Sequence, residues 1–170
     1  MVRHVVASAL AMLGLLAACS PGETATATAN AEASAPADAA RHPVSGLEVI
    51  DLVVERGGKP LAFKVELADS PEAQARGLMF RTALGDFEGM IFPSAAPEQR
   101  SFWMKNTPLS LDIIFIGPDG RVLNIAANTV PYSLDSVPSS GPASGVLELR
   151  GGRAADLGIV PGDLVNYTLP

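Results

Sequence analysis

Residues 102–116, FWMKNTPLSLDIIFI, form a strong apolar run that a Thr-Pro pair interrupts near its middle. Short apolar runs bounded by turn residues are typical of β-strands. The pattern therefore predicts two strands, 102–106 and 111–115, that pair as a hairpin around residues 107–110.

Side chains alternate along a strand, which gives the predicted hairpin one apolar face and one mixed face. Lys105 lies opposite Asp112 on the mixed face, beside the indole of Trp103. Such a surface fits a pocket wall, where a few polar groups orient a ligand against an apolar lining. It also fits a solvent-facing strand with an ion pair that contributes only ~0–1 kcal/mol. An exposed tryptophan reduces solubility, which is the argument for a pocket.

Turn residues punctuate the rest of residues 47–170, which hold 11 of the 14 prolines and 13 of the 16 glycines. Further strands are expected at 47–54, 61–67, 121–125, 146–149 and 164–169. One short helix is expected after Ser70 and ends at Gly77, and one turn of helix at 154–157 ends at Gly158. The sequence predicts a mainly β fold, a single compact antiparallel β-sandwich or barrel (jelly-roll-like) with one or two short helices.

The N-terminus carries an apolar run, Val5 to Ala18, that is too short to span a bilayer and matches a signal-peptide core. The run ends in LAAC at 16–19, which resembles the bacterial lipoprotein cleavage box. This resemblance implies a signal peptide over residues 1–19 and a lipid anchor on Cys19. Ser20, in the next position, favours the outer membrane, facing the periplasm. An ordinary secretory signal with an incidental cysteine is the alternative.

Residues 20–46 are rich in Ala, Thr, Ser and Pro and predict a disordered tether between the anchor and a domain over 47–170. That domain contains no Cys and no His. This composition excludes from it cysteine nucleophiles, Ser-His-Asp triads, zinc sites of His or Cys, haem ligation by His, and disulfides. The formal net charge of −6 argues against nucleic acid as a partner. No cofactor is predicted.

Two chemical alternatives involve other side chains of the domain. Its three methionines are Met79, Met90 and Met104, and thioethers suit Cu(I), although methionines beside aromatic residues also describe an ordinary core. Asp112 and Glu148, each flanked by apolar residues, could serve as acid and base of an envelope polysaccharide hydrolase if they share a cleft.

The favoured interpretation is a non-enzymatic module of the cell envelope that binds a small ligand, a glycan or an envelope protein. Its predicted binding residues are Trp103, Lys105 and Asp112, with Arg81, Asn106 and Glu148 as secondary candidates.

Several blocks of this sequence resemble one bacterial and archaeal family. The blocks are LADSPE at 67–72, RGLMFR at 76–81, GMIF at 89–92, the opening stretch at 102–116, and VLEL at 146–149. They look like the family called domain of unknown function 192, over nearly all of residues 60–166. The chain departs from it at Gly145, where members usually carry an aromatic residue. The resemblance implies a compact, mostly antiparallel β fold, often secreted or lipid-anchored. It implies no activity, since the family has no established substrate, cofactor or catalytic residue.

Overall fold

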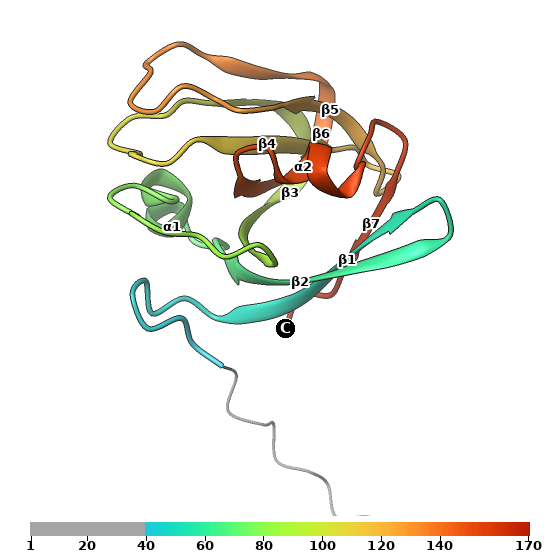
Figure 1. Cartoon of the computed structure of the whole chain (residues 1–170), viewed down its shortest axis with the longest axis horizontal. Helices are drawn as coiled ribbons and strands as arrows, with labels where there is room; N and C mark the ends of the chain where they lie inside the picture. The colour runs from blue at the N-terminus through green and yellow to red at the C-terminus, as the bar shows by residue number, and fades with distance from the viewer. Residues whose placement is uncertain (1–39) are drawn as a thin grey trace, which may run out of the picture. The chain divides into compact units, whose positions relative to one another are not determined.

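The computed structural model describes residues 40–170, which fold around one curled sheet of seven strands (Figure 1). The elements are β1 (Val49–Arg56), β2 (Lys59–Leu67), α1 (Pro71–Arg76), β3 (Glu88–Phe102), β4 (Leu111–Ile116), β5 (Val122–Ala126), β6 (Val137–Arg150), α2 (Arg153–Leu157) and β7 (Leu164–Tyr167). The predicted mainly β class and its two short helices are confirmed. The predicted signal peptide, Cys19 and most of the tether lie outside the described residues.

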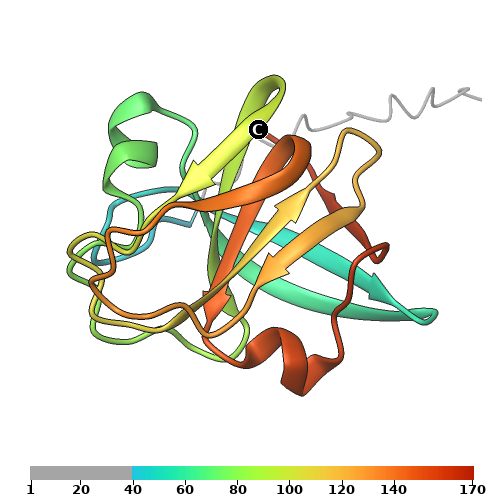
Figure 2. The same ribbon diagram turned by 90° about the horizontal axis from the view of Figure 1, so that it is seen from above.

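The strand order is β5-β4-β6-β3-β2-β1-β7. Neighbouring strands are antiparallel, except that β2 and β3 are parallel, so the sheet is mixed. Its curl, seen from above in Figure 2, brings the two edges together. There Arg121, just before β5, forms a bridge with Leu164 of β7. The result is a half-barrel made from a single sheet.

The hairpin turn and the helix ends carry residue types that favour their backbone conformations. Gly57 and Gly58, which join β1 to β2, have φ of +54° and +77°, a geometry whose twist matches antiparallel strands. Ser70 caps α1 by accepting a hydrogen bond from the amide of Ala73 at 3.1 Å, and the helix ends at Gly77 with φ of +49°. The second helix, α2, ends at Gly158 in the left-handed helical conformation. No helix within residues 40–170 is long and apolar enough to cross a membrane.

The hairpin predicted for residues 102–115 is wrong. β3 ends at Phe102, residues 103–110 form a loop, and β4 pairs with β5 on one side and β6 on the other. All six residues of β4 are buried. An apolar run without alternation marks a strand that is covered on both faces, and such a strand takes a central place in its sheet.

The central strands carry one core on each face. The first core fills the inside of the curl, where α2 also packs; its largest members are Leu52, Phe63, Ile91, Ile114, Ile116 and Leu147. The second core lies on the opposite face, beneath α1 and the neighbouring loops; its largest members are Met90, Phe92, Met104, Leu111, Ile113 and Phe115. The candidate site is a pocket between the segments that cover this second core.

Residues 40–46, which the sequence assigns to the tether, belong to the folded part of the chain. Arg41 forms a bridge with Glu48, and Nδ1 of His42 lies 3.6 Å from the carboxylate of Glu66 on β2. Ser45 donates a hydrogen bond to the same carboxylate. The domain therefore includes one histidine, because its N-terminal boundary lies earlier than predicted.

Candidate functional site

A pocket of about 480 Å³ lies between α1 and β3, over the second core. In Figure 1 this is the side of the molecule that carries α1, away from the β1–β2 hairpin. The side chains that line the pocket include those of Arg76, Phe92, Arg100, Trp103, Lys105 and Glu148.

The end of α1 forms one wall of the pocket. At Gly77 the backbone turns with positive φ, and a Cβ there would lie 3.4 Å from the ring of Phe92. Glycine thus allows the chain to turn closely over the second core. Leu78 then packs into that core, and Met79 lines the pocket.

Glu148 lies in the floor of the pocket. It stands opposite Met90 of β3 and Ile113 of β4, so its side chain points to the face of the second core. The residue is only 4% exposed; its carboxyl group makes no hydrogen bond among residues 40–170, and its oxygens open onto the pocket. Burial raises the pKa of Glu148 from 4.5 to about 8. At neutral pH the group is therefore an uncharged acid with one donor and one acceptor.

The predicted pairing of Asp112 with Glu148 as acid and base is contradicted. The two residues occupy successive rows of the β4–β6 ladder, so their side chains project from opposite faces of the sheet. The carboxylate of Asp112 instead accepts hydrogen bonds from the amides of Asn128 at 2.8 Å, Gly152 at 3.0 Å and Ala154 at 2.8 Å. Asp112 thereby holds the start of α2, which is a structural role.

The predicted opposition of Lys105 and Asp112 is also wrong, since Lys105 lies in the loop after β3. Its Nζ lies 5.1 Å from the ring centroid of Trp103, a cation–π arrangement. Half of the surface of Trp103 is exposed, and both residues line the pocket with Glu148. Three of the six predicted binding residues therefore come together.

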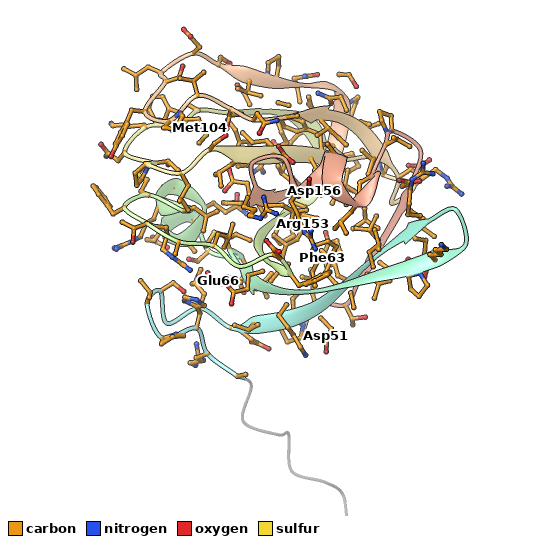
Figure 3. The ribbon with its side chains drawn as sticks, in the orientation of Figure 1. Asp51, Phe63, Glu66, Met104, Arg153 and Asp156 are labelled. Atoms are coloured by element: carbon orange, nitrogen blue, oxygen red, sulfur yellow. The ribbon has the colours of Figure 1, made fainter. Side chains whose placement is uncertain are left out.

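Arg81 and Asn106 have other contacts. Nη1 of Arg81 donates to Glu66 at 2.6 Å, and Nη2 lies 3.1 Å from Nε2 of His42, so this arginine belongs to a buried ion pair at the N-terminal loop. Figure 3 labels Glu66 there, on β2. Asn106 has a positive φ of +55° and donates to the sulfur of Met79 at 3.8 Å, so it supports the loop beside the pocket.

The three methionines proposed as copper ligands occupy packing positions. Met90 and Met104 are buried in the second core, and the hydroxyl of Thr129 donates to the sulfur of Met104 at 3.1 Å. Figure 3 labels Met104 in the interior beneath the loops. Met79 lines the pocket. Residues 40–170 contain no group of three or more His, Cys, Asp or Glu side chains arranged to hold a metal.

Sequence reasoning missed the contributions of α1 and β3 to the pocket. Arg76 lies in the last turn of α1, a position that follows from the predicted helix end at Gly77. Arg100 lies on β3, with its guanidinium 5.5 Å from the ring centroid of Phe102. Proline is disfavoured within strands, and the two prolines of β3 concealed that strand in the sequence.

Two solved structures are similar to this chain. A protein of unknown function from Novosphingobium aromaticivorans DSM 12444 shares 52% identity with a TM-score of 0.74, covering 78% of this chain and 94% of that chain. A protein from Sinorhizobium meliloti 1021, described as a "putative transcription regulator", shares 34% identity with a TM-score of 0.69, covering 71% of this chain and 95% of that chain. No curated protein matches. The profile of the family "Uncharacterized ACR", DUF192, matches residues 52–167, and the chain therefore belongs to the DUF192 family.

Proposed function

We propose that this protein is a non-enzymatic module of the cell envelope that binds a small organic ligand in the pocket beside α1. The observation that carries the proposal is the carboxyl group of Glu148, which belongs to a residue only 4% exposed, makes no hydrogen bond within the described residues and opens onto the pocket. No fully buried side-chain nitrogen or oxygen of the described residues lacks a hydrogen-bond partner, so the carboxyl oxygens of Glu148 open onto the pocket and are free to bond to a molecule in it. A ligand in the pocket would supply the missing partner.

The surroundings of Glu148 support recognition of an organic molecule. Phe92 and Phe102, whose rings meet edge-on at 5.1 Å between centroids, give the pocket apolar walls. Trp103 adds a half-exposed indole at the mouth, and aromatic surfaces of this kind contribute much of the contact area in binding sites. An apolar lining with few polar groups orients a ligand and needs no reactive group.

Binding is favoured over hydrolysis because no second catalytic carboxylate converges on Glu148 within the described residues. Glu98 is the other carboxylate of the lining, but it is exposed and bonds to the guanidinium of Arg100 at 3.1 Å. An exposed carboxylate held in a surface ion pair is not positioned to act together with the carboxyl group in the floor.

We propose further that the module is lipid-anchored through Cys19, on the outer membrane and facing the periplasm. The support is the sequence LAAC at 16–19 after an apolar run of signal-peptide length. Incorporation of labelled palmitate tests the anchor: the wild-type chain should be labelled and the Cys19→Ala variant should not. Equal labelling of both would contradict it.

Fragment mapping by ¹H–¹⁵N NMR tests the pocket. The full chain in detergent is titrated with a library of small polar and apolar fragments. Binders should shift the amide of Gly77 and the indole N–H of Trp103, and Trp103→Ala should abolish these shifts at Gly77. Tyr132→Ala, which removes an aromatic side chain that is exposed outside the pocket, is the matched control and should leave them unchanged. Binders whose shifts avoid the pocket, or a library without binders, would contradict the proposed function.

A further inference from the structure

The mouth of the pocket carries two cations that no carboxylate neutralises within residues 40–170. Arg76 is exposed at the end of α1 and forms no ion pair there. Lys105 has only the indole of Trp103 as a partner. The chain as a whole has a formal net charge of −6, so this mouth is a positive spot on an acidic protein. Such a spot attracts anions and repels cationic ligands.

The third cation of the lining is already used by the fold. The guanidinium of Arg100 donates to Ser94 at 3.0 Å, to Glu98 at 3.1 Å and to Gln74 at 3.2 Å. These contacts hold residues 94–100 of β3 against α1, which contributes Gln74. Arg100 therefore shapes the pocket, and Arg76 and Lys105 remain free to meet a ligand.

The interior of the pocket has a different character from its mouth. Phe92 is buried and Phe102 is partly buried, and among the described residues Glu148 is the one titratable group of the floor. The other titratable groups of the lining are Arg76, Glu98, Arg100 and Lys105, all on α1, β3 or the following loop. An uncharged carboxyl group among aromatic rings can lie against the uncharged part of a ligand and can hydrogen-bond to a polar group on it.

From this arrangement we infer that the ligand is a small organic anion, whose charged group binds at Arg76 and Lys105 and whose uncharged body extends inward to Glu148. This inference rests on the function proposed above and adds the ligand class to it. Arginine and lysine donate charge-assisted hydrogen bonds to carboxylates or phosphates, and these bonds are stronger than those between neutral groups. An amine would instead meet two like charges at the entrance.

The single tryptophan of the chain, Trp103, lines the pocket, and its emission provides the readout. The full chain in detergent is titrated at pH 6 with cyclohexanecarboxylate, cyclohexanecarboxamide and cyclohexylmethylamine, which share one ring and differ in charge. We expect the carboxylate to bind at least tenfold more tightly than the amide, and the amine to bind more weakly than either. Added salt should weaken the binding of the carboxylate more than the binding of the other two compounds.

Charge-removing variants locate the anion. Arg76→Gln and Lys105→Gln should each weaken carboxylate binding about fivefold or more and leave amide binding within twofold. Lys59→Gln is the matched control, since this exposed lysine lies in the β1–β2 hairpin, away from the pocket, and it should change neither affinity. If the affinity for cyclohexanecarboxylate is unchanged in both pocket variants, the placement of the anion is overturned.

A pH series tests the part played by Glu148. Because the burial that raises its pKa to about 8 keeps the group neutral below that pH, carboxylate binding to the wild type should fall by up to tenfold per pH unit above 8. Glu148→Gln should bind at pH 6 and keep its affinity at pH 9.5. A parallel decline in both proteins overturns this part of the inference.

Two outcomes separate the ligand class from the proposed function. Equal or tighter binding of the amide or amine overturns the anion and leaves a ligand pocket in place. The anion is likewise overturned, and the ligand pocket stays, if carboxylates fail to bind while other fragments shift the signals of Gly77 and Trp103. If neither the three compounds nor the fragment library binds, both proposals are overturned.

Discussion

Replacing Glu148 by glutamine should make the protein more stable at neutral pH. The ordinary pKa of a glutamate carboxyl group is 4.5, and burial, which disfavours the charge, raises the pKa of Glu148 to about 8 in the folded protein. Between these two pH values the folded chain holds one proton more than the unfolded chain. The free energy of unfolding therefore falls as pH rises, by about 1.4 kcal/mol per pH unit.

The size of the effect follows from the same two pKa values. The contribution is fully present below pH 4.5 and is lost as pH rises through 8, for a total of about 5 kcal/mol. At pH 7 about 3 kcal/mol has been lost. Glutamine has nearly the same shape and does not ionise. Glu148→Gln should thus match the wild type in stability near pH 4 and exceed it by about 3 kcal/mol at pH 7.

Urea unfolding, followed by far-UV circular dichroism at half-unit steps from pH 4 to 8.5, measures this difference. Other carboxylates titrate in both proteins and cancel from it. Glu98→Gln, which changes an exposed carboxylate of the same pocket, is the control and should follow the wild-type pH profile. A difference between Glu148→Gln and wild type that stays constant from pH 4.5 to 8 would refute a buried, unpartnered acid.

Further variants test the rest of the structure by urea unfolding. Asp112→Ala should lower the free energy of unfolding by about 4 kcal/mol, because three backbone amides lose a charged acceptor; a loss below 1 kcal/mol would contradict this role. Arg81→Ala should cost about 3 kcal/mol, because the buried carboxylate of Glu66 loses its arginine and keeps only Ser45 and His42 as neighbours; a double-mutant cycle with Glu66→Ala should show strong coupling, and additive losses would argue against the pair. Lys105→Ala should cost less than about 1 kcal/mol, since its one contact is an exposed cation–π pair; a larger loss would reveal a buried ion pair.

Local turn chemistry was the part of the fold that the sequence predicted well. The helix start after Ser70 and the helix ends at Gly77 and Gly158 each require a particular residue type at a particular position, so a single sequence can reveal them. Strand pairing was less accessible. β4 pairs with β6, with which it is not consecutive in the chain, in a register that runs from Leu111↔Arg150 to Ile116↔Gly145, and no local pattern specifies such a partner.

The candidate site was predicted in part for the same reason. Trp103, Lys105 and Glu148 were recognised by their residue types and do line one pocket. Asp112 was assigned to the same surface through a hairpin that does not form. Side chains alternate with a period of two, so the true ladder places it on the opposite face. Arg76 joins the site only through the packing of α1, which is a tertiary contact.

The central claim is that a small ligand binds against Trp103, over the carboxyl group of Glu148. Intermolecular nuclear Overhauser effects, measured on the full chain with the tightest-binding small molecule, test this claim most directly. We expect contacts from the ligand to the indole protons of Trp103 and to the methyl group of Met79, both in the lining of the pocket. Contacts confined to exposed side chains outside it, such as Val130 and Tyr132, would contradict the account.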